Sequence, residues 1–172
     1  MTARFPATLA LALALCLPLP ATAQTDADTR LHAEITRSLR SYTRLTIFDD
    51  VGASVQQGVV TLTGKVTMPF KKHEVGSRVA AIEGVRELRN DIGILPVSIE
   101  DDELRKRLAR AIYGNPAFHR YAAMPNPPIH ILVEHGRVTL TGVVPTELDR
   151  TLARSLAAGH GERSVTCALE TR

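Results

Sequence analysis

The chain has 172 residues, of which 44% are hydrophobic and 23% charged, and its formal net charge is +3. These values are typical of a folded globular protein and argue against wholesale disorder, a collagen-like repeat and a multi-span membrane protein. Aromatic residues make up only 4% of the chain, which argues against a large aromatic-lined cleft and against recognition of bases by stacking. The small net charge argues against an electrostatic nucleic-acid binder, so we expect no nucleic-acid partner.

The first 23 residues have the organisation of a secretory signal peptide. A single cation, Arg4, is followed by an apolar run over residues 9–17, and Ala21 and Ala23 supply the small side chains that signal peptidase requires. The run is too short to span a bilayer as a stable helix. We therefore predict cleavage after Ala23, removal of residues 1–23 and a periplasmic location for the rest of the chain.

The two cysteines are too few for a disulfide scaffold. Cys16 suggests a lipoprotein signal as an alternative, but it follows Leu15 rather than a small residue and lies inside the apolar run, so we favour cleavage after Ala23. The cleaved chain then keeps one thiol, Cys167. It is either a small buried strand residue or a thiol that pairs between molecules in an oxidising compartment. No CxxC motif supports a thiol–disulfide oxidoreductase.

The chain beyond the signal contains an internal duplication. Residues 55–66 align with residues 133–144 at a constant offset of 78, and both glycines of each segment stay in register. Seven consecutive positions, 60–66 and 138–144, differ only at Lys65. Such a match indicates two copies of one structural unit.

Each copy is predicted to fold as helix, strand, strand, helix and strand. The second helices are expected over 72–82 and 147–158, and the third strands over 86–95 and 164–169. The join at 94–99 is short and partly apolar, unlike a flexible linker, so the two units are expected to pack on each other. Apolar residues spaced by four predict the first helices: Leu31, Ile35 and Leu39, and Leu104, Leu108 and Ile112.

Turn and capping residues recur in register between the copies. We expect the first glycine of each copy to lie in the hairpin turn and the second to end the following strand or to admit the next helix closely. The third is expected to end the second helix. Asp28, and Asp101 or Asp102, precede the first helices as expected of N-cap residues. The six glycines are Gly58, Gly64, Gly84, Gly136, Gly142 and Gly161.

The order of elements, the two GxVTLTGxV hairpins and the ending GVRELRNDI of the first copy resemble the BON domain of bacterial envelope proteins. This resemblance implies an α+β fold with two tandem αββαβ domains, over residues 26–97 and 100–172, each a three-stranded mixed sheet covered by two helices. The second copy departs from the pattern at Glu162 and Cys167 and carries an insertion over 114–128. The resemblance also implies a non-enzymatic protein that binds membranes. Some members bind anionic phospholipid or act in envelope and osmotic stress.

The first helix of the second copy carries a cluster of positive charges. Arg105, Lys106, Arg107 and Arg110 lie outside its apolar stripe. One interpretation is a solvated face with ion pairs to acids four residues away. The other is a basic surface that meets anionic phospholipid head groups, where each nearby cation adds about 1 kcal/mol.

The insertion and the residue before it hold three of the chain's seven aromatic residues within nine positions, from Tyr113 to Tyr121. Its prolines predict a rigid loop rather than a helix. The rings either pack back onto the sheet or form an exposed apolar edge for a membrane interface or a client protein, a setting that suits tyrosine. Phe118 and Tyr121 therefore join the basic residues as candidate lipid contacts.

The sequence indicates no catalytic, metal or cofactor site. Its six histidines show neither an HExxH motif nor zinc-ligand spacing, and no serine lies in a GxSxG elbow. We therefore predict a non-enzymatic periplasmic protein that associates with anionic phospholipid surfaces. The alternative is an interaction or chaperone-like module for other exported envelope proteins. No small-molecule substrate is expected.

Overall fold

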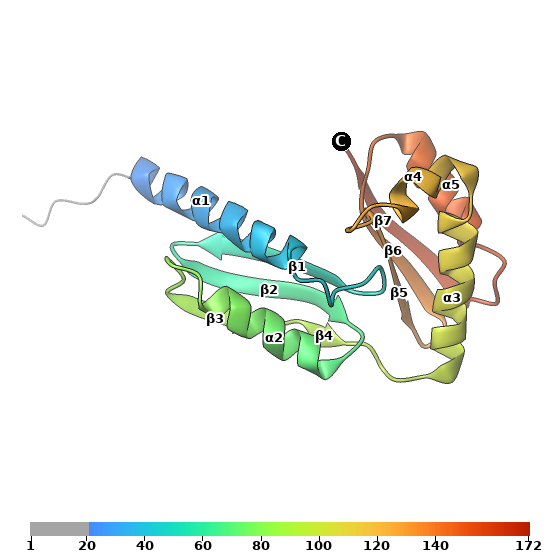
Figure 1. Ribbon diagram of the computed structural model, residues 1–172, viewed down its shortest axis with the longest axis horizontal. Helices are drawn as coiled ribbons and strands as arrows, with labels where there is room; N and C mark the ends of the chain where they lie inside the picture. Colours follow the sequence, from blue (N-terminus) through green and yellow to red (C-terminus); the bar gives the residue numbers. More distant parts are fainter. Residues whose placement is uncertain (1–20) are drawn as a thin grey trace, which may run out of the picture.

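A computed structural model of the protein describes residues 21–172 (Figure 1). The predicted signal peptide lies outside these residues except for its last three positions, and Cys16 lies outside them too. Within residues 21–172, no helix is long and apolar enough to cross a membrane. The described chain forms two units that follow one another in sequence, each with its own sheet and its own hydrophobic core.

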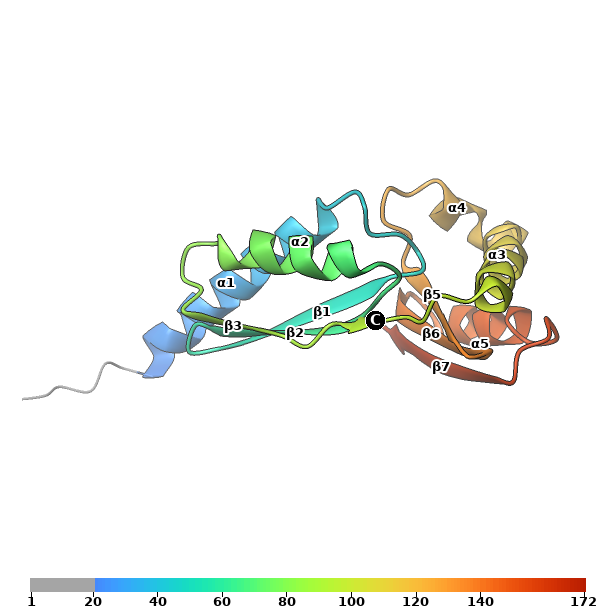
Figure 2. The ribbon, with the colours of Figure 1, turned by 90° about the horizontal axis from the view of Figure 1, so that it is seen from below.

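The first unit contains two helices and one mixed sheet. β1 pairs antiparallel with β2, whereas β3 and β4 pair parallel to β2, so the predicted third strand is present in two pieces. Figure 2 shows both helices on one face of this sheet. The elements are α1 (Ala21–Arg40), β1 (Asp50–Gln56), β2 (Val59–Val66), α2 (Pro69–Ala80), β3 (Glu87–Asn90) and β4 (Gly93–Ile94).

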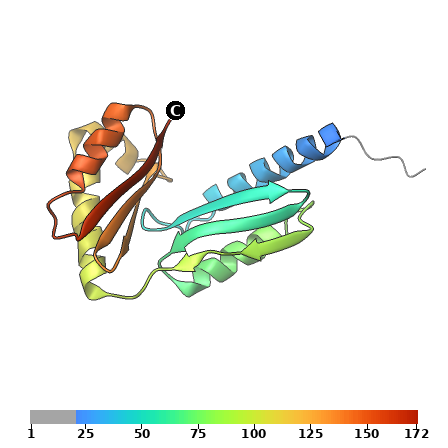
Figure 3. The ribbon, with the colours of Figure 1, turned by 180° about the vertical axis from the view of Figure 1, so that it is seen from behind.

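The second unit repeats this order and adds two short helices. β5 pairs antiparallel with β6, and β6 pairs parallel with β7, which gives the αββαβ order and mixed sheet that the sequence predicts. Figure 3 shows the faces of both sheets that the helices leave uncovered. The elements are α3 (Ile99–Tyr113), η1 (Pro116–Phe118), α4 (His119–Ala122), β5 (Ile129–Glu134), β6 (Arg137–Val144), α5 (Glu147–Leu156) and β7 (Ser164–Thr171).

The apolar residues that the sequence predicts on one side of the first helix of each unit lie in the two cores. In the first unit, Leu31 and Ile35 of α1 are buried together with Val60 and Leu62, two residues of β2 that point to the same face of the sheet. The second core is built in the same way from α3 and β6. Each such side chain contributes about 1.5–3 kcal/mol when it is removed from water. The two units therefore have separate apolar cores rather than one large one.

Several details of local structure differ from the predictions. Gly84 and Gly161 do not end the second helices, because the C-caps of α2 and α5 are Ala81 and Ala157. The insertion is not a loop throughout, because Pro116–Phe118 form a 3-10 helix and His119–Ala122 form a turn of α-helix. Pro116 is compatible with this, since it lies in the first turn, where its missing N–H is not needed. The N-cap of α3 is Ser98, not an aspartate, and its Oγ accepts a hydrogen bond from Asp101 N at 3.2 Å.

The aspartates that were expected to cap the first helices hold the hairpin turns instead. The Asp101 carboxylate accepts hydrogen bonds from the backbone N–H groups of His135 and Gly136, each at 2.8 Å. Asp28 accepts the equivalent bonds from residues 57 and 58, at 2.7 and 3.0 Å. Both residues of each turn have positive φ, as a type I′ hairpin turn requires. One carboxylate on the first helix thus fixes the hairpin of each unit.

Gly64 and Gly142 lie inside the second strand of each hairpin rather than at its end. Their φ angles are +109° and +114°, and a Cβ added to them would lie 2.1 Å from Asp50 O and 2.0 Å from Pro128 O. The close approach that the sequence predicts is therefore made, but to the start of the neighbouring strand and not to the next helix. A side chain at either position would collide with backbone.

A buried ion pair orders the loop between α1 and β1. Lys71 Nζ donates to Asp49 Oδ2 at 2.6 Å, and the two side chains are 7% and 0% exposed. Asp49 also accepts hydrogen bonds from the backbone N–H and hydroxyl groups of Thr46 and Thr67. Burial alone would raise the pKa of Asp49, but the Lys71 ammonium and the threonine donors outweigh it and lower this pKa.

The same loop carries the contact between the two units. Ile47 and Phe48 pack against the second core, and Ile47 O accepts a hydrogen bond from Ile131 N at 2.7 Å, on the outer edge of β5. Lys65 of β2 forms an ion pair with Glu134 of β5, and this partner holds the pKa of Glu134 below its usual range. The units therefore pack on each other, as the short apolar join predicts.

Candidate membrane-contact surface

Helix α3 turns its polar side to solvent because its apolar stripe is buried in the second core. Ile99, Glu103, Lys106 and Arg110 are exposed and follow one another at spacings of four, three and four, which places them on one stripe of the helix. Arg107 is exposed beside them. We call Lys106, Arg107 and Arg110 the α3 basic surface.

The fourth predicted basic residue, Arg105, is not part of this surface. It is only 4% exposed, and its Nη2 donates to Val133 O at 2.6 Å while its Nη1 pairs with Asp102. Arg105 therefore ties α3 to the end of β5. Its burial removes it from the predicted lipid contacts.

The three cations of the α3 basic surface differ in their present partners. Lys106 pairs with Glu103 at 3.1 Å, and both side chains are more than half exposed, so this pair is weak and easily exchanged. Arg107 donates to His160 O at 3.2 Å. The Arg110 side chain forms no ion pair or hydrogen bond with any residue in the range 21–172. An anionic surface would therefore meet few competing contacts here.

The rings of the insertion lie in the second core. Phe118 is 0% exposed and Tyr121 is 4% exposed, and the rings stack with their centroids 5.7 Å apart. The Arg120 guanidinium lies 4.7 Å from the Tyr121 centroid, and its Nη2 donates to the Tyr121 hydroxyl at 2.7 Å. The alternative in which the rings pack back onto the fold is confirmed. The exposed apolar edge is wrong for these two rings, which cannot contact a membrane from this position.

The exposed apolar residues near α3 lie in the join and at the end of the insertion. Val97 is 91% exposed, Ile99 is 78% exposed and Met124 is 44% exposed. Sequence reasoning assigned the join to packing between the units and so missed its exposed residues. Ile99 lies on the same stripe of α3 as Lys106 and Arg110, so an apolar residue and two cations project from one side of the helix.

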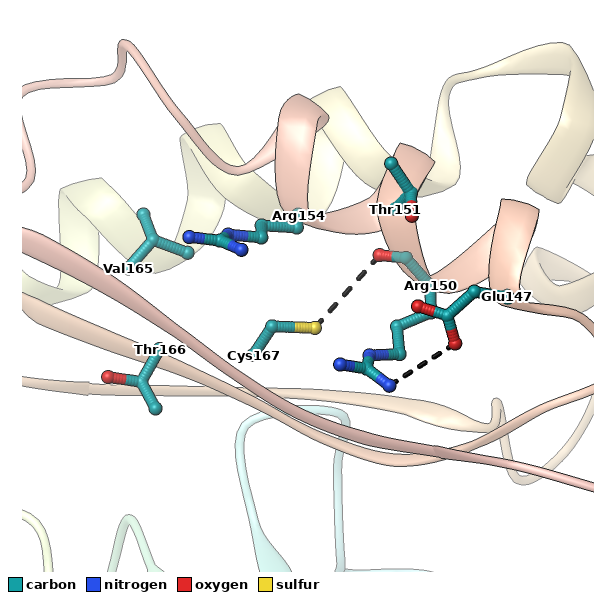
Figure 4. Close-up of a pocket in the computed structure, with 7 residues that line it drawn as sticks. All are labelled: Glu147, Arg150, Thr151, Arg154, Val165, Thr166 and Cys167. Atoms are coloured by element: carbon teal, nitrogen blue, oxygen red, sulfur yellow. Dashed lines mark hydrogen bonds and ion pairs between the residues drawn. The ribbon is translucent and has the colours of Figure 1, made fainter.

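A second candidate site is a pocket of about 330 Å³ between α5 and β7, shown in Figure 4. Cys167 is partly buried in it, with Sγ 4.0 Å from Arg150 O, and it forms no disulfide within the described chain. Residues 21–172 contain no cluster of three or more side chains that could hold a metal ion. The lining residues are Glu147, Arg150, Thr151, Arg154, Val165, Thr166 and Cys167.

Comparison with known proteins finds the same duplication. The family model of the BON domain matches the chain twice, over residues 27–96 and 100–172. No curated protein sequence matches the chain. Among solved structures, CdsD, a structural protein of the type III secretion system of Chlamydia trachomatis, is 14% identical, with 83% of this chain and 92% of that chain covered and a TM-score of 0.34. The structure of its C-terminal domain is 17% identical, with coverages of 84% and 67% and a TM-score of 0.34.

Proposed function

The chain belongs to the BON domain family, and from that membership we propose that it is a non-enzymatic protein of the bacterial envelope that associates with anionic phospholipid surfaces. The contact is made by the α3 basic surface. The proposal includes export to the periplasm through the signal at residues 1–23 and action during envelope or osmotic stress, as the family resemblance implies.

The observation that carries this proposal is the exposure of three cations on one side of α3. A cation close to an anionic membrane surface contributes about 1 kcal/mol, and the contributions of neighbouring cations add. Ile99 projects from the same stripe and is 78% exposed, so it can enter the interface beside the charges. Helices that lie on membranes combine apolar residues that enter the interface with basic residues that meet the lipid head groups.

Replacing Lys106, Arg107 and Arg110 together with glutamine is expected to weaken binding to anionic vesicles by up to about 100-fold, at about 1 kcal/mol for each cation. The measurement is flotation or sedimentation of the purified protein with vesicles of phosphatidylethanolamine, with and without phosphatidylglycerol, at low ionic strength. Binding should require phosphatidylglycerol and fall as salt is added, because exposed charges are screened.

The matched control removes three positive charges elsewhere. Arg86, Arg89 and Arg137 are exposed and lie outside α3, so a triple glutamine variant at these positions has the same net charge. It is expected to bind like the original protein. Equal losses in the two triple variants would show that only net charge matters. If the original protein fails to bind phosphatidylglycerol vesicles at low salt, the proposal is wrong.

A further inference from the structure

The outer edge of β7 is open along its whole length. The sheet order is β5-β6-β7, and the other edge, β5, is already contacted by Ile47 of the first unit. Within residues 21–172, β7 pairs with β6 alone, in continuous register from Ser164 to Thr171. Charged residues and proline usually protect an edge strand, and residues 164–169 of β7 contain neither. This edge therefore offers unpaired backbone donors and acceptors to a further strand.

The corresponding edge of the first unit is interrupted, and one side chain explains the difference. Asn90, which aligns with Cys167, donates from Nδ2 to Lys72 O at 3.0 Å and accepts at Oδ1 from Ile92 N at 3.4 Å. These bonds tie the strand to α2 and break it between β3 and β4. Gly76 makes room for the amide, since a Cβ there would lie 2.6 Å from Nδ2.

The second unit has neither half of this arrangement. Cys167 replaces the asparagine, and the fully buried Ala153 of α5 replaces the glycine. Only the long Cys167 Sγ contact to Arg150 O, at 4.0 Å, then joins this position of β7 to the helix. The strand continues unbroken, and the pocket of about 330 Å³ lies between α5 and β7. Figure 4 shows Val165 and Cys167 on the strand side of this pocket and Arg154 extending over it from the helix.

We propose that the β7 edge and the adjoining pocket form a docking groove for an extended peptide segment of another protein that carries an acidic side chain. The segment adds a strand to β7 through main-chain hydrogen bonds, and alternate side chains enter the space between β7 and α5. Addition of a strand beside a helix is an established mode of peptide recognition, in which the main chain provides affinity and the pockets provide specificity.

The charges at the groove select the acidic partner. Arg150 is paired with Glu147 at 3.2 Å, whereas the exposed Arg154 has no ion-pair partner among residues 21–172. A carboxylate on the added strand supplies that partner.

The test is selection of peptides from a phage-displayed random library on the purified protein, followed by fluorescence anisotropy with the enriched peptides. We expect enrichment of sequences that alternate apolar and other residues and contain Asp or Glu. Arg154→Glu should weaken their binding at least tenfold. Arg110→Glu makes an equal change of charge on α3 and should leave peptide binding unchanged. This control variant distinguishes the groove from the membrane-contact surface.

A second variant closes the groove without changing its charge. Ala153→Gly with Cys167→Asn restores the pair found in the first unit and is expected to abolish peptide binding while circular dichroism shows the fold intact. The proposal is overturned if no peptide is enriched above background, or if the enriched peptides bind Arg154→Glu as well as the original protein. A concentration-dependent dimer that the double variant abolishes would also overturn it, in favour of a second copy.

Discussion

Replacing Asp49 with alanine is expected to lower the free energy of unfolding by about 3–5 kcal/mol, because removal of one partner leaves the other charge buried and unpaired. Lys71 is only 6% exposed and has Asp49 as its ion-pair partner. The backbone N–H groups of Thr46 and Thr67 lose their acceptor at the same time. Urea unfolding at neutral pH, followed by circular dichroism, measures the effect.

Two further variants separate the charge from the hydrogen bonds. Asp49→Asn keeps a side-chain oxygen for the threonine donors but loses the charge, so it should destabilise less than Asp49→Ala. Adding Lys71→Met to Asp49→Ala removes the unpaired ammonium and should recover part of the lost stability. If Lys71→Met makes the alanine variant less stable still, the buried charge is not the cause.

The stability that Asp49 provides should also depend on pH. The pKa of Asp49 is lowered in the folded protein relative to the unfolded chain, where an aspartate titrates at about 3.9. The unfolded state therefore takes up the proton first, and the stabilisation is fully present above this value and is lost as the pH falls through the lower, folded pKa. The difference between the original protein and Asp49→Asn should be constant near neutral pH and shrink in acid. A difference that grows in acid would contradict the lowered pKa.

Repetition explains which parts of the fold could be predicted from the sequence. The hairpin turns, with Gly58 and Gly136, and the helix stripes occur twice, so one copy supports the interpretation of the other. The Asp49 network occurs once. The positions that align with Asp49 and Thr67 in the second copy are Pro127 and Pro145, which carry no acceptor or donor side chain. Nothing in the duplication could therefore distinguish Asp49 from an ordinary turn residue.

The candidate site depended on side-chain burial, which spacing along one helix predicts only in part. The i,i+4 spacing correctly placed Leu104 and Leu108 in the core, but Arg105 lies next to the stripe and is buried because its guanidinium reaches the carbonyl of Val133 in another element. That carbonyl is supplied by tertiary structure. The groove beside β7 could likewise not be predicted, since it arises where Cys167 and Ala153 of the second unit replace Asn90 and Gly76 of the first.

The aromatic residues of the insertion show the same limit. Three rings within nine residues are equally compatible with an exposed edge and with a small extension of the core. Which of these two arrangements forms depends on the surface of the fold beneath the insertion. Here η1 and α4 contact α3, and Phe118 and Tyr121 join the second core, which also contains Ile129 of β5. Tyr113 contributes from the end of α3, where its hydroxyl donates to Ile129 O and burial raises the pKa of Tyr113.

Phe118→Ala is therefore expected to lower the free energy of unfolding by about 3–5 kcal/mol, since a fully buried ring is removed from a closed core. Phe118→Leu keeps most of the apolar volume and should cost far less. Vesicle binding distinguishes this role from a membrane contact. A ring that entered the interface would lose binding in the leucine variant, even with stability nearly retained, whereas a core ring leaves binding to phosphatidylglycerol vesicles unchanged. We expect unchanged binding, because the cations that face outward belong to α3 and the rings of the insertion face inward.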